Sequence, residues 1–109
     1  MASPKSLTAI RKLWKAYLAA PFPRRLPGDN PDRVDLGVLD SYTAGCIDTF
    51  LSRNGRLDLW RTAILGLCYG DLCTFLPGLK GQGRQYFTRL KELAGLVLEA
   101  VRDGVKTTR

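Results

Sequence analysis

The sequence predicts an all-α fold, an antiparallel four-helix bundle that forms a single domain over residues 1–109. Clusters of proline and glycine divide the chain into four segments, and their connections are short enough to join antiparallel neighbours. With 109 residues and 45% hydrophobic composition, the chain can bury one core without metal or disulfides. Apolar residues recur at intervals of three or four, the period of a helix face, over residues 4–20, 34–53, 58–76 and 84–103.

The first helix is expected to begin at Ser3-Pro4, because serine is a favoured N-cap and proline fits the first helical position. A basic strip lies beside its apolar face. The proline-rich segment 21–33 that follows is expected to be a linker. The strip and the linker together supply a candidate basic surface, formed by Arg11, Lys12, Lys15, Arg24 and Arg25.

The second and third helices each carry an aspartate within an apolar arc, Asp40 and Asp71. A buried carboxylate needs a partner. The two could face each other as an acid and base pair or a cation site, although a structural hydrogen-bonded network is the simpler interpretation. Candidate partners for Asp71 are Arg53, Arg61, Tyr42 and Tyr69.

The third helix is apolar on nearly every side and is therefore predicted to be the most buried of the four. Its principal face is expected to contain Trp60, Ile64, Leu67, Cys68, Leu72 and Phe75. Asn54-Gly55 predicts a left-handed stop for the second helix, and Asp58 is the expected N-cap of the third.

Residues 77–84 are expected to form a glycine-rich loop that ends at the start of the fourth helix. Such a loop can turn backbone N–H groups toward an anion, and a helix N-terminus favours negative charge. The candidate anion or phosphate site comprises Lys80, Gly81, Gly83 and Arg84. It lacks the GK[ST] ending of a Walker A motif, and glycine also serves helix-to-helix turns for purely conformational reasons.

The sequence offers no convincing catalytic residue. It contains no histidine, which removes the commonest general base and metal ligand. Cys46, Cys68 and Cys73 lie in apolar helices, where burial lowers thiol reactivity, and their spacing does not suit a compact zinc site. An odd number of cysteines favours a reducing compartment, so we expect a cytoplasmic protein. Because histidine is absent and the cysteine spacing is unsuitable, we expect no cofactor and no metal. No apolar run is long enough to span a bilayer, and no membrane partner is expected.

The net charge is +7, with basic ends and a mildly acidic middle. Two functions are compatible with these features. The first is a protein-interaction or regulatory module, with self-association included, because apolar residues exceed what one core needs. The second is nucleic-acid binding by the first helix and the segments 21–33 and 77–84. An enzyme that acts on a phosphorylated small molecule is a third, weaker hypothesis.

Overall fold

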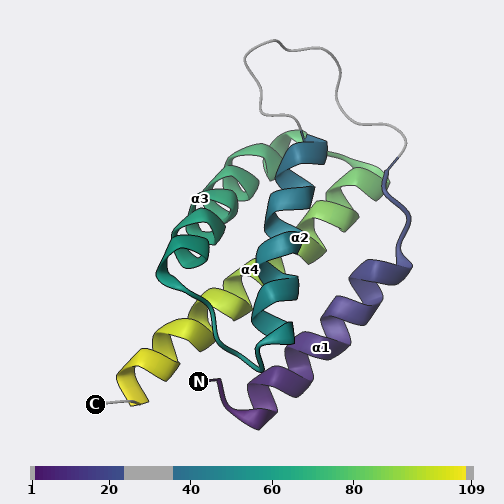
Figure 1. The fold of residues 1–109 in the computed structure, drawn as a ribbon. Coiled ribbons are helices and arrows are strands. Elements are labelled where there is room, and N and C mark those ends of the chain that lie inside the picture. Colours follow the sequence, from purple (N-terminus) through teal and green to yellow (C-terminus); the bar gives the residue numbers. More distant parts are fainter. Residues whose placement is uncertain (1, 24–35, 108–109) are drawn as a thin grey trace.

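Four α-helices make up almost all of the computed structural model, which describes residues 2–23 and 36–107. Consecutive helices run in opposite directions (Figure 1), and the described residues contain no strand. The predicted all-α bundle is therefore confirmed. The elements are α1 (Pro4–Ala19), α2 (Leu36–Ser52), α3 (Leu59–Phe75), the short 3-10 turn η1 (Leu76–Gly78) and α4 (Gly81–Thr107).

Side chains cap the first turns of α1 and α3, as the sequence predicts. The Ser3 hydroxyl accepts a hydrogen bond from the Ser6 N–H at 3.1 Å. The Asp58 carboxylate accepts one from the Arg61 N–H at 3.1 Å. Each cap satisfies a backbone donor that the helix itself cannot pair, so both helix starts depend on local chemistry.

The predicted left-handed stop of α2 is also confirmed. The Asn54 N–H donates to the Leu51 carbonyl at 3.2 Å, and the Gly55 N–H donates to the Phe50 carbonyl at 2.9 Å. Asn54 has φ 54° and Gly55 has φ 94°. This pair of hydrogen bonds is a Schellman motif, which satisfies carbonyls at the end of a helix and reverses the chain.

The fourth helix is longer than the predicted 84–103. It begins at Gly81 and continues to Thr107. Leu79, just before the helix, is buried, and the second half of the expected glycine loop, residues 81–84, forms the first turn of α4. Gly104 is buried within α4 and does not end it, because a single helical glycine costs only about 1 kcal/mol relative to alanine.

The helix at the centre of the bundle is α4, which packs against each of the other three (Figure 1). Its 27 residues give about 40 Å of helix, close to the 47 Å length of the molecule. The prediction that the third helix is the most buried is wrong. Only Leu65, Cys68 and Leu72 are buried on α3, because α2 and α4 cover one side of this helix and leave the other open.

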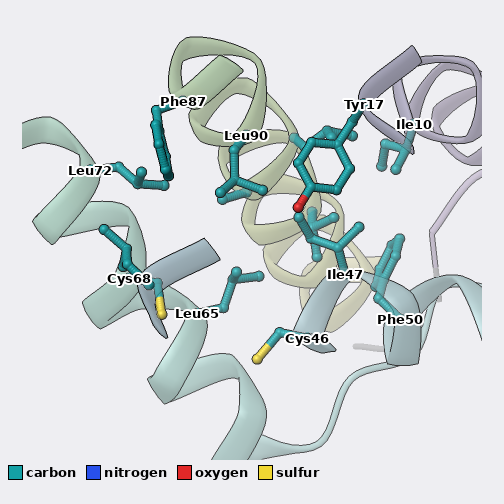
Figure 2. Packing of buried hydrophobic residues seen from close by; sticks show 14 of the residues in the cluster. Ile10, Tyr17, Cys46, Ile47, Phe50, Leu65, Cys68, Leu72, Phe87 and Leu90 are labelled. Atoms are coloured by element: carbon teal, nitrogen blue, oxygen red, sulfur yellow. The ribbon is translucent and has the colours of Figure 1, made fainter. Parts of the chain in front are cut away.

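Side chains from all four helices meet in one core (Figure 2). Phe87, Leu90 and Leu93 of α4 are fully buried, together with Ile47 and Phe50 of α2. Ile10 of α1 and Leu65 of α3 close the core from either side. Among the described helices, none combines the length and apolar composition needed to cross a membrane.

Candidate functional site

The side of α3 that faces away from the bundle carries no charge. Every exposed residue of this helix is apolar or small and uncharged, whereas the exposed residues of α1, α2 and α4 include charged ones. This surface, called here the outer face of α3, consists of Leu59, Trp60, Ala63, Gly66, Leu67, Gly70, Cys73 and Thr74. It runs along the whole helix.

Three large apolar side chains project from the outer face. Leu59 is 86% exposed, Trp60 is 74% exposed and Leu67 is 73% exposed. Trp60 and Leu67 are seven residues apart and therefore lie on one side of the helix, two turns from each other. The sequence assigned both to the buried face, whereas Cys68 and Leu72 of that face are indeed buried. The apolar residues that exceed what the core needs therefore lie on the surface of α3.

A stripe of small residues lies beside these side chains. Ala63, Gly66 and Gly70 follow one another at intervals of three and four, which places them on one stripe of the helix. A Cβ atom added at Gly66 or Gly70 would meet nothing within 4 Å. Packing within the bundle therefore does not require either glycine, although each costs the helix about 1 kcal/mol relative to alanine.

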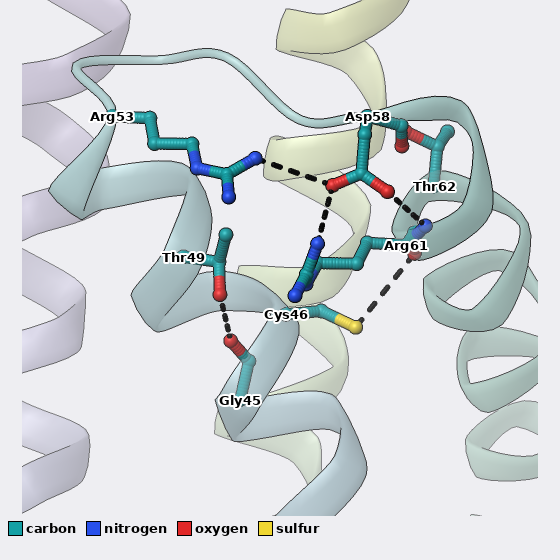
Figure 3. Close-up of polar contacts among 7 residues, drawn as sticks. All are labelled: Gly45, Cys46, Thr49, Arg53, Asp58, Arg61 and Thr62. Atoms are coloured by element: carbon teal, nitrogen blue, oxygen red, sulfur yellow. Dashed lines mark hydrogen bonds and ion pairs between the residues drawn. The ribbon is translucent and has the colours of Figure 1, made fainter.

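Ion pairs around Asp58 fix the N-terminal end of this helix (Figure 3). The Arg61 guanidinium donates to the Asp58 carboxylate at 2.8 Å, and that of Arg53 lies 3.4 Å from it. The hydrogen bonds from Arg61, with the side chain contributing most, hold the pKa of Asp58 below its usual value. Cys46 reaches the Arg61 carbonyl at 3.7 Å, so this cluster also joins α2 to α3.

Asp71 does not form the buried network that the sequence suggested. Its side chain is half-buried at the edge of the outer face. Arg53 and Arg61 are engaged by Asp58 instead. Within the described part of the chain, no hydrogen bond or ion pair joins Asp71 to either arginine or to Asp40.

Asp40 does have partners, and they come from α1 and α4. The Tyr17 hydroxyl donates to Asp40 Oδ1 at 2.5 Å, and the Tyr86 hydroxyl lies 2.9 Å from the same oxygen. The two phenol oxygens are 3.1 Å apart. One carboxylate thereby ties three helices together. The sequence identified Asp40 but not the tyrosines, which are distant in the chain and have no local signal.

The network favours neutral phenols. Burial, and then the hydrogen bond to Asp40, raise the pKa of Tyr17 well above its usual value. Burial is also the main cause that raises the pKa of Tyr86 to about 12, and Asp40 adds to it. Phenols with raised pKa values are poor general bases and poor nucleophiles at neutral pH. The two phenols are therefore neutral hydrogen-bond donors at neutral pH, and they join α1 and α4 to Asp40 of α2.

Alkaline pH is expected to destabilise the protein through these two tyrosines. Their folded-state pKa values lie above the unfolded value of 10.0, so their contribution is complete below about pH 10 and is lost as pH rises further. We expect the denaturation midpoint to fall above pH 10. The fall should be shallower for the double variant Tyr17→Phe, Tyr86→Phe and unchanged for Tyr42→Phe, an exposed control. Equal profiles for all three proteins would contradict this assignment.

The described residues of the candidate basic surface differ in what they contact. Lys12 and Lys15 are exposed on α1. The Arg11 guanidinium instead donates to the Leu51 carbonyl at 3.1 Å and lies 3.4 Å from Asn54 Oδ1, so it caps the end of α2. Arg24 and Arg25 lie outside the described residues. Of the three described residues, Arg11 contacts the end of α2, whereas Lys12 and Lys15 are exposed.

The candidate anion site has a different form from the predicted loop. Gly81 and Gly83 belong to the first turn of α4, and Gly83 is buried. Lys80 and Arg84 are exposed at this end. The shallow depression beside them is lined by Gly81, Arg84, Gln85, Thr88, Arg89 and Glu92, and the Glu92 carboxylate would oppose a bound anion.

No other chemistry emerges from the described residues. Cys46 and Cys68 are buried and Cys73 is exposed. Burial raises the pKa of the Cys46 thiol, which lowers its nucleophilicity at neutral pH. Within the part of the chain that the structure describes, no group of side chains is arranged to hold a metal ion. No protein-family model matches the chain, and comparisons with curated proteins and solved structures give no match either.

Proposed function

We propose that this protein is a protein-interaction module, a helical bundle that presents the outer face of α3 to another polypeptide. The observation that carries the proposal is the exposure of Leu59, Trp60 and Leu67 on a helix side without charge. Contiguous apolar surface of this kind marks interaction sites. Tryptophan is also among the residues that dominate binding energy at protein interfaces.

The energy available at this face suits a modest, reversible interaction. The three large side chains offer on the order of 400 Å² of apolar surface. Removal of that area from water contributes on the order of 10 kcal/mol. Association itself costs roughly 4 to 15 kcal/mol. Binding through α3 therefore depends on close packing of the small residues between the large ones, in addition to apolar area.

Site-specific photo-crosslinking in cells that produce the protein tests this function. Benzoylphenylalanine in place of Leu67 or Leu59 lies on the outer face and leaves the core unchanged, since both side chains are exposed. We expect each to give a discrete covalent adduct with a protein. The same probe in place of Gln85, an exposed residue of α4, is the matched control. Absence of an adduct above this control at both positions would contradict the proposed function.

Nucleic-acid binding by the basic surface is the alternative proposal. It is supported by the exposed lysines Lys5, Lys12 and Lys15, which lie on a helix without acidic residues. The use of Arg11 as a helix cap weighs against it. Such binding would appear as affinity for duplex or single-stranded nucleic acid that falls steeply with added salt.

A further inference from the structure

We infer that the occupant of the outer face of α3 is a second copy of this chain, packed helix against helix in a two-fold dimer. Trp60 and Leu67 of each copy would pack against the stripe of small residues Ala63, Gly66 and Gly70 of the other. This inference rests on the proposed function and names its partner.

The face carries both halves of a self-complementary contact. Each copy offers two large exposed side chains, Trp60 and Leu67, beside a stripe of small residues. A two-fold axis brings the same patch of both subunits together, so a contact between the large side chains of one copy and the small stripe of the other occurs twice. Residues without large side chains let two helix backbones approach closely. This accounts for Gly66 and Gly70, which no contact inside the bundle explains.

The charge distribution determines where two copies can meet with the least repulsion. The chain carries a net charge of +7, so two copies repel each other through most of their surface. The exposed residues of α3 contribute nothing to this repulsion. Helix α1, which carries exposed lysines, lies on the opposite side of the bundle from α3 (Figure 1). Pairing through α3 therefore places the two cationic helices on the far sides of the dimer.

The size of the face predicts a weak dimer. Two copies paired along α3 bury on the order of 1,000 Å² in total, the lower limit for a specific interface. We therefore expect a monomer to dimer equilibrium with a Kd in the micromolar range. Added salt should strengthen it, because salt screens repulsion between the two positive copies while the apolar contact persists.

The test uses the full chain under reducing conditions, so that exposed Cys73 forms no disulfide. Sedimentation equilibrium from micromolar to millimolar concentration should follow the mass from 12.1 kDa toward twice that value. The double variant Gly66→Ala, Gly70→Ala should raise the dimer Kd about tenfold or more. Measured at concentrations where both proteins are monomeric, the same variant should melt several degrees higher than the wild type, because alanine favours the helix.

Two further variants distinguish pairing through α3 from association through another part of the surface. Gly45→Ala makes the same substitution on α2, where a Cβ also meets nothing within 4 Å; it should raise the melting temperature and leave the Kd unchanged. Leu67→Glu changes an exposed side chain and should abolish the dimer without unfolding the monomer. A dimer insensitive to both the double glycine variant and Leu67→Glu would show a different interface and overturn the inference.

A different partner for the outer face of α3, or none, would give a different experimental result. A chain that stays monomeric at all concentrations overturns the second-copy inference, and so does association that added salt weakens. If the photo-crosslinked adduct then contains a different protein, the proposed interaction function stands and only its partner is wrong. Co-sedimentation of the monomer with vesicles of mixed neutral and anionic phospholipid would assign the face to a lipid surface and overturn both proposals.

Discussion

Replacement of Gly55 by alanine is expected to lower the free energy of unfolding by about 2 to 4 kcal/mol, because a strained backbone conformation and a steric clash add together. Gly55 has φ 94° in the turn that ends α2, a conformation that L-residues rarely adopt. A Cβ there would lie 2.9 Å from the Cβ of Ala2 and 3.3 Å from Leu7 Cδ2. Chemical denaturation of the wild type and of the Gly55→Ala protein measures the difference in the free energy of unfolding.

A second substitution distinguishes the clash from the backbone strain. Ala2→Gly in the Gly55→Ala protein removes the closest atom, the Ala2 Cβ, but leaves φ and the Ala2 nitrogen at 3.2 Å unchanged. We expect partial rescue. Gly45→Ala is the control, since it places the same methyl group in open space and should stabilise the helix by about 0.5 to 1 kcal/mol. A Gly55→Ala protein as stable as the wild type would disprove the close packing of this turn on the N-terminal segment.

The features that the sequence predicts well are those that depend on neighbouring residues. Ser3 and Asp58 accept hydrogen bonds from N–H groups three residues ahead, and the Asn54-Gly55 stop also closes within one turn. Such contacts can be recognised from a few letters of sequence. The same holds for the number of helices and for most of their boundaries, which follow the spacing of apolar residues.

Contacts between distant residues could not be predicted in this way. The Arg11 guanidinium reaches a carbonyl 40 residues away, so a side chain assigned to a basic surface turns out to cap a helix. Tyr86 reaches Asp40 across 46 residues. Each of these pairings depends on how the helices are placed relative to one another, and the periodicity of a single helix does not contain that information.

The outer face of α3 shows why an apolar helix is ambiguous. Its composition predicts that it must be covered, but not by what. Helical periodicity places Trp60 and Leu67 in the core of this chain, whereas the structure leaves both exposed. A more informative signal for an uncovered side was the pair of glycines in the same helix, four residues apart on one side. Glycine lowers helix stability relative to alanine, and its presence is explained where another backbone must approach closely.

Substitution of Asp40 by alanine is expected to lower the free energy of unfolding by about 1 to 3 kcal/mol, because Tyr17 and Tyr86 lose the carboxylate that they share, and only one of the two hydroxyls can then donate to the other. Tyr17 and Tyr86 are both buried, and each directs its hydroxyl toward Asp40 Oδ1. Asp40→Asn keeps an oxygen at this position and should cost less. Thermal and urea denaturation of the three proteins gives the comparison.

A combined variant separates the loss of a partner from the loss of packing. If unsatisfied hydroxyls cause the instability, their removal should restore stability: Asp40→Ala with Tyr17→Phe and Tyr86→Phe should be more stable than Asp40→Ala alone. Replacement of all polar partners by apolar groups of similar shape is much less costly than removal of one of them. Additive losses would instead show that the phenols do not depend on Asp40. The network would then contribute only through the packed rings of Tyr17 and Tyr86, whose centroids lie 5.3 Å apart.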